Sequence, residues 1–316
     1  MYDLLIIGAG PAGLSAAVYG ARANLQVALL EKGLPGGQMQ NTTEVENYTG
    51  FKMIMGPELS QVMYEHALHL GVDYHTADVE KVELEGRIKK VHTTKGVFEA
   101  KALLIATGAE PKQLGAKGET EFRGRGVSYC ATCDGAFFNE KRPGMDKGLI
   151  VVGGGDSAVE EGAFLTRFNK VTLIHRRDKL RAQPILQKRA FENPRMSFIW
   201  DSTVEEIIGD QAVTGVRVKN LKTGEVRELP ANGVFIYVGM QPNTDFLAGS
   251  KILNEAGYIV TDETMKTSIP GVFAAGDVRD KGLRQIITAA SDGAIAAMSA
   301  YHYIESQEDA KADPIG

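Results

Sequence analysis

Two stretches of the chain repeat one pattern of apolar and polar positions. Each opens with a short apolar run, turns on glycines, continues with helical spacing and ends in a second apolar run. They are "YDLLIIGAGPAGLSAAVYGARANLQVALLEK" (2–32) and "GLIVVGGGDSAVEEGAFLTRFNKVTLIHRR" (148–177). Short apolar runs of this kind are typical of strands buried in a parallel sheet. The pattern therefore predicts two copies of one β-α-β unit.

The end of the chain adds a third apolar segment. "TSIPGVFAAGDV" (267–278) and "TAASDGAIAAMSAYHYI" (288–304) predict a strand, a glycine turn and a final helix, which we expect to join the first unit. Glycine and proline punctuate "ATGAEPKQLG" and "VGMQPNTDF", as at crossings between domains. We therefore predict an α/β fold of two Rossmann-like, three-layer dinucleotide-binding domains. The outer domain would comprise residues 1–114 and 243–316, and the inserted domain residues 115–242.

Composition narrows the class of protein. The chain has 316 residues, 43% of them hydrophobic, which suffices for large cores. Its net charge of −5 argues against binding to nucleic acid, which requires an excess of basic residues. The uncharged stretch between Asp3 and Arg22 is interrupted by glycines and lacks a basic start, so we expect neither a signal peptide nor a membrane anchor. With only two cysteines, a reducing, cytoplasmic setting is expected.

Each glycine turn has the spacing of a dinucleotide site. The first position permits a tight turn, the second lets the backbone approach a pyrophosphate, and the third lets helix and strand pack closely. Gly8, Gly10 and Gly13 fill these positions in the first copy. The second copy has Gly153, Gly155 and Ala158. Because the strand and helix flank both turns, we expect two dinucleotides, each with its pyrophosphate at a helix N-terminus.

The end of the second strand distinguishes the two nucleotides. Glu31 closes the first copy, where a carboxylate can accept hydrogen bonds from ribose hydroxyls, as in FAD or NAD; a surface carboxylate is the alternative. His175 holds the same position in the second copy, followed by Arg176, Arg177 and Arg181. Guanidinium groups suit a 2′-phosphate, so the inserted domain is predicted to prefer NADPH; a solvated basic strand end is the alternative.

The two cysteines, Cys130 and Cys133, form a C-x-x-C motif with three readings. A zinc site would need two more ligands, and His66 with His69 is the available pair, although in an unusual order and in the other domain. Inert core thiols are the second reading. A redox dithiol at a helix start is the third and the one we favour, because the helix dipole lowers a thiolate pKa. No metal is expected.

Asp134 follows the motif directly. It could carry the proton that thiol–disulfide exchange needs, or it could cap a helix N-terminus. With a flavin in the outer domain, electrons would pass from NADPH to FAD and on to the Cys130/Cys133 disulfide.

Nearly the whole chain resembles the bacterial thioredoxin reductases of the low-molecular-weight type. The matching motifs are "GAGPAG", "GGQ", "VEN", "ATG", "CATCD", "GGGDSAVEE", "HRRDKLRA", "PGVFAAGDV" and "RQIITAA". The resemblance implies that Asp277 contacts the ribityl chain of FAD. The other flavin-site residues that it implies are Pro11, Ala12, Gly37, Gln38, Asn47, Ala106, Thr107, Gly108, Gly276, Arg284, Gln285 and Ile286.

The resemblance also implies roles in the inserted domain. Asp156, Ser157 and Glu160 would flank NADPH. Cys133 would lie beside the flavin, Cys130 would attack the substrate disulfide, and Asp134 would be the acid/base.

The implied function is a homodimeric thioredoxin-disulfide reductase with thioredoxin as its protein substrate. The inserted domain would rotate about hinges near Gly115 and Asn243. Alternatives are reduction of another thioredoxin-like protein, a flavin dithiol oxidase, or an NADPH sensor without turnover. Residues 139–148 form a longer connection than the family usually carries, and we expect a solvated loop.

Overall fold

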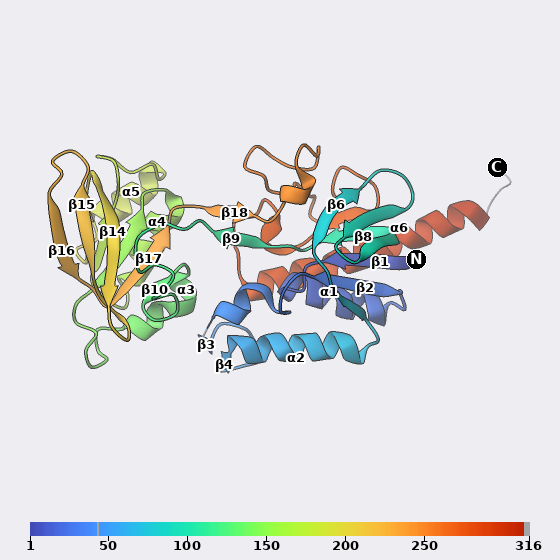
Figure 1. The fold of residues 1–316 in the computed structure, drawn as a ribbon, viewed down its shortest axis with the longest axis horizontal. Helices are drawn as coiled ribbons and strands as arrows, with labels where there is room; N and C mark the ends of the chain where they lie inside the picture. The colour runs from blue at the N-terminus through green and yellow to red at the C-terminus, as the bar shows by residue number, and fades with distance from the viewer. Residues whose placement is uncertain (43, 313–316) are drawn as a thin grey trace. The chain divides into compact units, whose positions relative to one another are not determined.

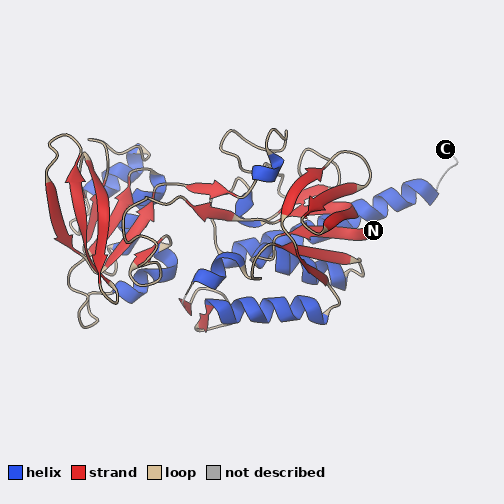
Figure 2. Cartoon of the chain, in the orientation of Figure 1, coloured by secondary structure: helices blue, strands red, loops and turns tan. Residues whose placement is uncertain are grey.

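The computed structural model describes residues 1–42 and 44–312 and divides the chain into two compact units. Unit 1 comprises Met1–Glu110 and Gln241–Gly316, and unit 2 comprises Pro111–Met240. The chain passes between them twice, along β9 (Ala109–Pro111) and β18 (Met240–Pro242), which pair with each other. Figures 1 and 2 show the elements of each unit.

Unit 1 is built on a seven-stranded sheet. Its parallel part has the order β5-β2-β1-β8, and β19 pairs with the distal half of β8. β6 and β7 form an antiparallel meander with the first half of β8. The strands are β1 (Tyr2–Ile7), β2 (Val27–Glu31), β5 (Asp73–Thr76), β6 (Val79–Glu83), β7 (Lys89–Thr93), β8 (Gly96–Ile105) and β19 (Val272–Ala274).

Three helices complete unit 1. They are α1 (Pro11–Arg22), α2 (Gly56–His69) and α6 (Ile286–Ala312). The small residues of α6 let it lie close to α1, since a Cβ on Gly293 would come within 2.0 Å of the Ala12 carbonyl oxygen. Short elements are η1 (Gly37–Asn41), η3 (Asp245–Leu247), η4 (Gly276–Val278), β3 (Glu44–Val45) and β4 (Ile54–Met55).

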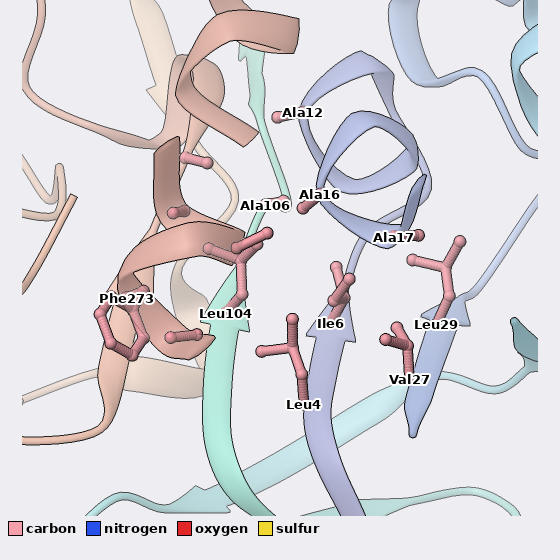
Figure 3. Packing of buried hydrophobic residues seen from close by; sticks show 14 of the residues in the cluster. Leu4, Ile6, Ala12, Ala16, Ala17, Val27, Leu29, Leu104, Ala106 and Phe273 are labelled. Carbon is pink, nitrogen blue, oxygen red and sulfur yellow. The ribbon is translucent and has the colours of Figure 1, made fainter. Parts of the chain in front are cut away.

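The sheet of unit 1 is buried on both faces, which explains why β1 is an unbroken apolar run. Leu4 and Ile6 pack among the helices α1 and α6 (Figure 3), whereas Leu5 and Ile7 pack into a second core on the opposite face. Successive side chains of a strand point to opposite faces, so both sets must be apolar.

Unit 2 has a five-stranded parallel sheet of order β10-β17-β11-β12-β13 and an antiparallel sheet of order β14-β15-β16. The strands are β10 (Val127–Ser128), β11 (Leu149–Gly153), β12 (Val171–Ile174), β13 (Met196–Ile199), β14 (Ser202–Gly209), β15 (Val213–Asn220), β16 (Val226–Pro230) and β17 (Gly233–Tyr237). The helical elements are α3 (Ala131–Asp134), η2 (Gly135–Phe138), α4 (Asp156–Leu165) and α5 (Pro184–Phe191).

The same alternation of faces occurs in unit 2. Leu149 and Val151 of β11 belong to a core with residues of α4 and α5, whereas Ile150 and Val152 belong to one with residues of β14 and β15. The α/β fold with two parallel-sheet units is thus confirmed, including the final strand and helix that join the first unit. The two three-stranded meanders had no counterpart among the sequence predictions.

Candidate active site

The glycine turn of unit 1 links β1 to α1. Gly8 has a φ of 102°, and a Cβ on Gly13 would lie 1.8 Å from the Gly8 carbonyl oxygen. Only glycine fits such a backbone angle and such close packing. Among the described residues, no atom lies within 4 Å of a Cβ built on Gly10, the N-cap residue of α1. Open space therefore lies over the start of α1, and helix N-termini with unpaired N–H groups suit a pyrophosphate.

Glu31 lies at this turn, as its place at the end of β2 predicted. Its Oε2 accepts a hydrogen bond from the Ala9 N–H (2.8 Å), and its Oε1 accepts one from the Gly33 N–H (2.9 Å). These bonds fix the carboxylate beside the glycine turn. That this carboxylate binds a ribose, rather than being a surface carboxylate, stays a prediction.

Segments far apart in the sequence meet around the same turn. A Cβ on Gly37 would lie 3.3 Å from the Gly10 Cα, and the Ala106 N–H donates to the Ile7 carbonyl (2.8 Å). Asn47 Nδ2 donates to Gln285 Oε1 (3.0 Å), which brings together residues 238 positions apart. Most of the implied flavin-site segments thus converge on one end of the parallel sheet, where nucleotides bind in such folds.

Thr107, Gly108 and Arg284 are held by contacts of their own. Thr107 Oγ1 donates a hydrogen bond to the Asn243 carbonyl (2.7 Å), and Asn243 Nδ2 donates one to the Thr107 carbonyl (2.9 Å). The Gly108 carbonyl accepts from the Asn243 N–H (3.0 Å). The Arg284 guanidinium lies 4.7 Å from the centre of the Tyr258 ring, so part of this side chain is committed to a cation–π contact.

Asp277 lies in the short helix η4, directly after β19. Its Oδ1 is buried and has no hydrogen-bond partner among the described residues. Burial raises the pKa of this carboxyl, while Lys281 and Arg284 partly oppose the shift. This buried oxygen can accept a hydrogen bond, and a ribityl hydroxyl is a donor of the right kind.

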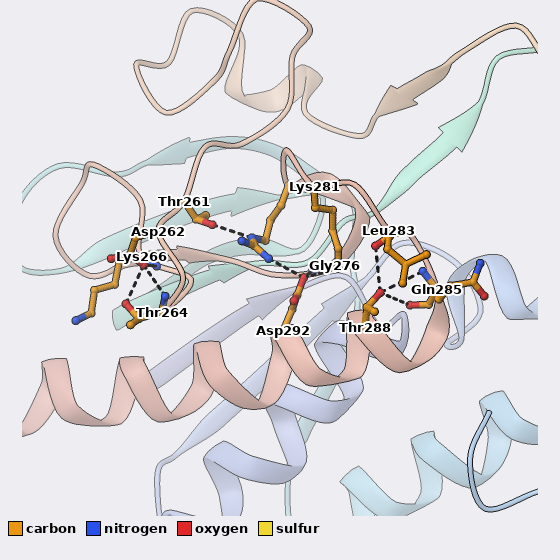
Figure 4. A network of polar contacts seen from close by, with 11 residues as sticks. Thr261, Asp262, Thr264, Lys266, Gly276, Lys281, Leu283, Gln285, Thr288 and Asp292 are labelled. Atoms are coloured by element: carbon orange, nitrogen blue, oxygen red, sulfur yellow. Dashed lines mark hydrogen bonds and ion pairs between the residues drawn. The ribbon is translucent and has the colours of Figure 1, made fainter. Parts of the chain in front are cut away.

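A charged cluster around Asp292 was not predicted from the sequence (Figure 4). The Oδ2 atom of Asp292, on α6, accepts hydrogen bonds from the Gly276 N–H (3.0 Å), Arg279 (2.9 Å) and Lys281 (2.8 Å). The side chains of all three charged residues are only 11% exposed. Asp292 therefore fixes the turn that carries Asp277. A single acidic residue in an alanine-rich helical run was the only sequence signal.

The glycine turn of unit 2 links β11 to α4 in the same way. A Cβ on Gly153 would lie 2.5 Å from the Tyr237 carbonyl oxygen, and one on Gly154 would lie 2.2 Å from the His175 ring. Within the described ranges, a Cβ on Gly155 meets no atom within 4 Å, so open space again lies over the turn. The third position, Ala158, is fully buried. Ser157 and Glu160 are exposed on the first turns of α4.

The basic segment after β12 is fastened to this turn. The Arg181 N–H donates to the Gly154 carbonyl (2.7 Å), and Asp156 accepts from the Gln183 N–H (2.7 Å) and from Gln183 Nε2 (3.2 Å). Asp156 therefore supports the basic segment. A cavity of about 240 Å³ lies there, lined by Arg176, Arg177, Asp178, Lys179, Leu180, Arg181, Asp201 and Lys222.

His175 is buried under Gly154 and is only 4% exposed. Its Nε2 has no partner among the described residues. Burial lowers the pKa of His175, and the nearby Arg181 and Arg177 lower it further. The imidazole therefore favours its neutral form, and the positive charge of the cavity comes from the arginines and lysines.

Cys130 and Cys133 form a disulfide with a Cα–Cα distance of 5.3 Å. Cys130 is the N-cap residue of α3, as the spacing predicted. The helix has only four residues, so its dipole contributes less than a long helix would. The Ser128 hydroxyl accepts from the Cys130 N–H (3.0 Å), and the Tyr237 hydroxyl accepts from the Ala131 N–H (2.8 Å).

Asp134 ends α3 and makes no capping hydrogen bond, so the cap alternative is wrong. Its Oδ2 accepts from the Ser128 hydroxyl (2.5 Å). Burial raises the pKa of Asp134, and the Ser128 bond partly offsets the shift. The same serine thus contacts both the dithiol backbone and the carboxyl that can hold a proton for it.

Two further acids of unit 2, Glu161 and Glu119, were not predicted from the sequence. Glu161, on α4, has a buried Oε2 without a partner among the described residues, and burial raises its pKa. Glu119 is 2% exposed and accepts hydrogen bonds from the Leu114 N–H, the Gly115 N–H and the Tyr129 hydroxyl. Glu119 therefore ties the entry to unit 2 to the residue before Cys130.

The two histidines considered for zinc and the loop after the dithiol lie on the surface of their units. His66 and His69 are exposed on α2, and no group of three metal-ligating side chains occurs in the part of the chain that the structure describes. None of the described helices is long and apolar enough to cross a membrane. Residues 139–148 form a mostly exposed loop, held by bonds from Asn169 to the Phe138 and Met145 carbonyls.

Comparisons with known proteins agree with this geometry. The profile of the family described as pyridine nucleotide-disulphide oxidoreductase matches residues 2–293. The thioredoxin reductases of Listeria monocytogenes and Bacillus subtilis are each 53% identical over 311 residues, which cover 98% of this chain and 96% of each relative. The crystal structure of thioredoxin reductase from Streptococcus pyogenes superposes with a TM-score of 0.90 at 55% identity, covering 97% of this chain and 99% of that one. Two glycine turns, a basic cavity and a disulfide thus occur in a chain that belongs to the pyridine nucleotide-disulphide oxidoreductase family.

Proposed function

We propose that this protein is an NADPH-dependent thioredoxin-disulfide reductase that uses FAD and the Cys130–Cys133 disulfide. The observation that carries the proposal is the disulfide itself, formed by the only two cysteines of the chain and placed beside a buried carboxyl. The relatives named thioredoxin reductase support the choice of acceptor.

FAD is the cofactor that the turn of unit 1 fits. The open space over Gly10, the fixed carboxylate of Glu31 and the partnerless Oδ1 of Asp277 match a pyrophosphate, a ribose and a ribityl chain, respectively. When bound, a flavin accepts hydride from a reduced nicotinamide and can pass the electron pair to a disulfide.

NADPH is the donor that unit 2 fits. Arg176, Arg177 and Arg181 make no ion pair with a carboxylate in residues 1–42 and 44–312, so their guanidinium groups are available for a ligand. A 2′-phosphate is the part of NADPH that such a cluster recognises. The alternative, a solvated basic strand end, does not account for the cavity that these arginines line.

The protein residues have distinct parts in the reduction of the disulfide. Two electrons and two protons convert the Cys130–Cys133 disulfide into two thiols. The raised pKa of Asp134 lets this carboxyl hold a proton near neutral pH better than an exposed aspartate does. Ser128 keeps the carboxyl and the Cys130 backbone together. By the resemblance, Cys130 attacks the substrate disulfide and Cys133 faces the flavin.

The resemblance implied hinges near Gly115 and Asn243. We propose instead that the hinges of the domain rotation are β9 and β18, where the chain crosses between the two units. Each strand is three residues long, and they pair where the chain passes between the units. We also propose that the protein is a cytoplasmic homodimer. Light scattering of the purified protein tests the dimer.

Serine variants of the two cysteines test the function. We expect Cys130→Ser and Cys133→Ser each to reduce NADPH-dependent reduction of thioredoxin to the background of the assay, because neither can close the disulfide. The yellow flavin absorbance should remain, since neither sulfur belongs to the glycine turn of unit 1. Activity that survives in either variant contradicts the proposal.

The same variants test the division of labour. A thioredoxin with one active-site cysteine, supplied as its mixed disulfide with thionitrobenzoate, should exchange with the Cys130 thiolate of Cys133→Ser, so that thionitrobenzoate leaves and a stable mixed disulfide joins the two proteins. Cys130→Ser should not form this adduct. Mass spectrometry of the intact complex detects the adduct. The reverse pattern would exchange the roles of the two sulfurs.

A further inference from the structure

The turn between β15 and β16 carries a lysine to the basic cavity of unit 2. Asn220 Oδ1 accepts hydrogen bonds from the N–H groups of Lys222 and Thr223, both at 2.9 Å. The Leu221 N–H donates to the Asp201 carbonyl (2.6 Å), and the Asp201 N–H donates to the Arg177 carbonyl (3.1 Å). The backbone of the turn is thus fixed to the segment that carries the arginines.

The side chain of Lys222 lies between two carboxylates that line the same cavity. Its Nζ is 3.0 Å from Asp201 Oδ2 and 4.0 Å from Asp178 Oδ2. Asp201 is the more buried of the two acids, with 19% of its side chain exposed, whereas Asp178 is 69% exposed. The hydrogen bond to Asp201 raises the pKa of Lys222, so the amine stays charged at neutral pH.

The two carboxylates matter because a phosphate monoester carries roughly −1.5 to −2 charge at pH 7. Without a cation beside them, Asp201 and Asp178 would repel a phosphate bound by the guanidinium groups of the same cavity. A dinucleotide that lacks the phosphate has no charge at this place. The repulsion would therefore act on one of the two nicotinamide nucleotides and not on the other.

We propose that Lys222 is a specificity-determining residue of the NADPH site, which keeps the cavity open to a 2′-phosphate by neutralising Asp201 and Asp178. This inference rests on the proposed use of NADPH. If so, the turn between β15 and β16 contributes to the preference of unit 2 for one nicotinamide nucleotide over the other.

Binding of two nucleotide fragments to the full-length protein tests the inference without turnover. Isothermal titration calorimetry with 2′,5′-ADP measures binding with the 2′-phosphate, and titration with 5′-AMP measures binding without it. We expect Lys222→Ala to weaken 2′,5′-ADP binding about tenfold through the uncovered charges and to leave 5′-AMP binding unchanged. Lys219→Ala is the matched control: Lys219 lies in the same hairpin, pairs with Glu205 (3.0 Å) and does not line the cavity.

A double variant separates neutralisation from direct contact. Asp201 has a φ of 51°, a region that asparagine tolerates, so Asp201→Asn preserves the backbone. If Lys222 acts mainly by neutralising Asp201, the double variant Asp201→Asn/Lys222→Ala should bind 2′,5′-ADP within about threefold of the unmodified protein, since the carboxylate that Lys222 contacts at 3.0 Å is then uncharged. Absence of this recovery overturns the inference. So does an equal loss for both fragments, or no loss in Lys222→Ala.

Arg176→Ala distinguishes failure of this inference from failure of the proposed NADPH site. If Arg176→Ala weakens 2′,5′-ADP binding and Lys222→Ala does not, only the role of Lys222 is wrong. If neither variant changes the preference for 2′,5′-ADP over 5′-AMP, the proposed NADPH site is wrong as well.

Discussion

The two units follow one chain path and differ in three places. Each runs strand, helix, strand, helix, strand, then a meander, then a strand that returns beside the first. In unit 1 the ten-residue β8 is both the last strand of the meander and the returning strand. In unit 2 these tasks belong to separate strands, β16 and β17, with residues 231–232 between them.

The second difference is the fifth parallel strand. In unit 1 it is β19, which comes late in the chain and leads into Gly276 and Asp277. In unit 2 it is β10, which comes first and leads into the disulfide and Asp134. Both strands pair with the returning strand, and each is followed by a buried carboxyl with a raised pKa. One position in a repeated fold thus carries the proposed flavin contact in one unit and the disulfide in the other.

The third difference is the residue after the second strand. Glu31 hydrogen-bonds to the backbone of its own glycine turn, whereas His175 is buried against its turn and leaves the cavity to the arginines that follow. A carboxylate at this place favours ribose hydroxyls, and cations favour a phosphate. The comparison shows that one scaffold can be specialised by side chains at the carboxyl ends of its strands.

The largest expected effect is on stability and comes from replacing Asp292. Among the described residues, no charged cluster of this kind surrounds the dithiol. Asp292→Ala leaves Arg279 and Lys281 as two neighbouring, largely buried cations. We expect it to cost about 3–5 kcal/mol of stability, as for other broken buried ion pairs. In a urea titration, flavin release monitors the unfolding of unit 1. The fluorescence of Trp200, the only tryptophan, monitors the unfolding of unit 2.

Asp280→Ala is the control for this variant, because Asp280 lies next to Arg279 but is exposed and accepts one hydrogen bond, from Asn254. It should cost less than about 1 kcal/mol. If the Trp200 transition shifts as much as flavin release does, the effect of Asp292 is not confined to unit 1.

A smaller effect is expected from exchanging the third residue of the glycine turns. In Gly13→Ala the new Cβ must displace the Gly8 carbonyl oxygen, so we expect a loss of about 1–3 kcal/mol together with weaker flavin binding. Ala158→Gly only removes a methyl group from a helix and should cost about 1 kcal/mol. The same two unfolding probes measure both. Equal costs would mean that the two turns pack alike.

The smallest effect is the pH dependence contributed by Asp134. Because its pKa is raised in the folded protein, it stabilises the fold fully at low pH, and this contribution is lost as pH rises through the folded pKa. The free energy of unfolding of the oxidised protein should therefore fall relative to Asp134→Asn as pH rises above about 4. Urea titrations between pH 4 and 8 measure it.

Ser128→Ala sharpens this pH test. The Ser128 hydroxyl donates to Asp134 and favours its charged form. Removing that bond should move the loss of stability to higher pH. A curve that is parallel to that of Asp134→Asn at every pH would show that Asp134 does not titrate in this range.

The sequence predicted the parts of the site that depend on local pattern. The glycine turns, Glu31 at the end of β2 and the disulfide at the start of α3 each lie within a short motif with a fixed geometry. Strand alternation could not be seen, because both faces of β1 and β11 are buried and every position is apolar. The parallel strands were therefore recognised by their length and flanking turns.

The residues that the sequence did not reveal act across long stretches of chain. Asp292 bonds to Gly276, 16 positions away, and Lys222 lies beside Asp201 only because β14 and β15 fold back on each other. The Oε2 atom of Glu161 is buried and Glu160 is exposed, although both belong to one "VEE" run. Which of two adjacent carboxylates is buried depends on how α4 packs, and no spacing rule contains that information.

The bonds from Arg181 to Gly154 and from Gln183 to Asp156 have a consequence for affinity. They join the loop that would receive the pyrophosphate to the loop that would receive the 2′-phosphate, so the protein itself sets the spacing between the two proposed anion sites. When the second phosphate of a matching nucleotide binds, the protein loops are already ordered, so little of their conformational entropy is lost. The two joined loops would therefore select a ligand by the distance between its phosphates as well as by its charge.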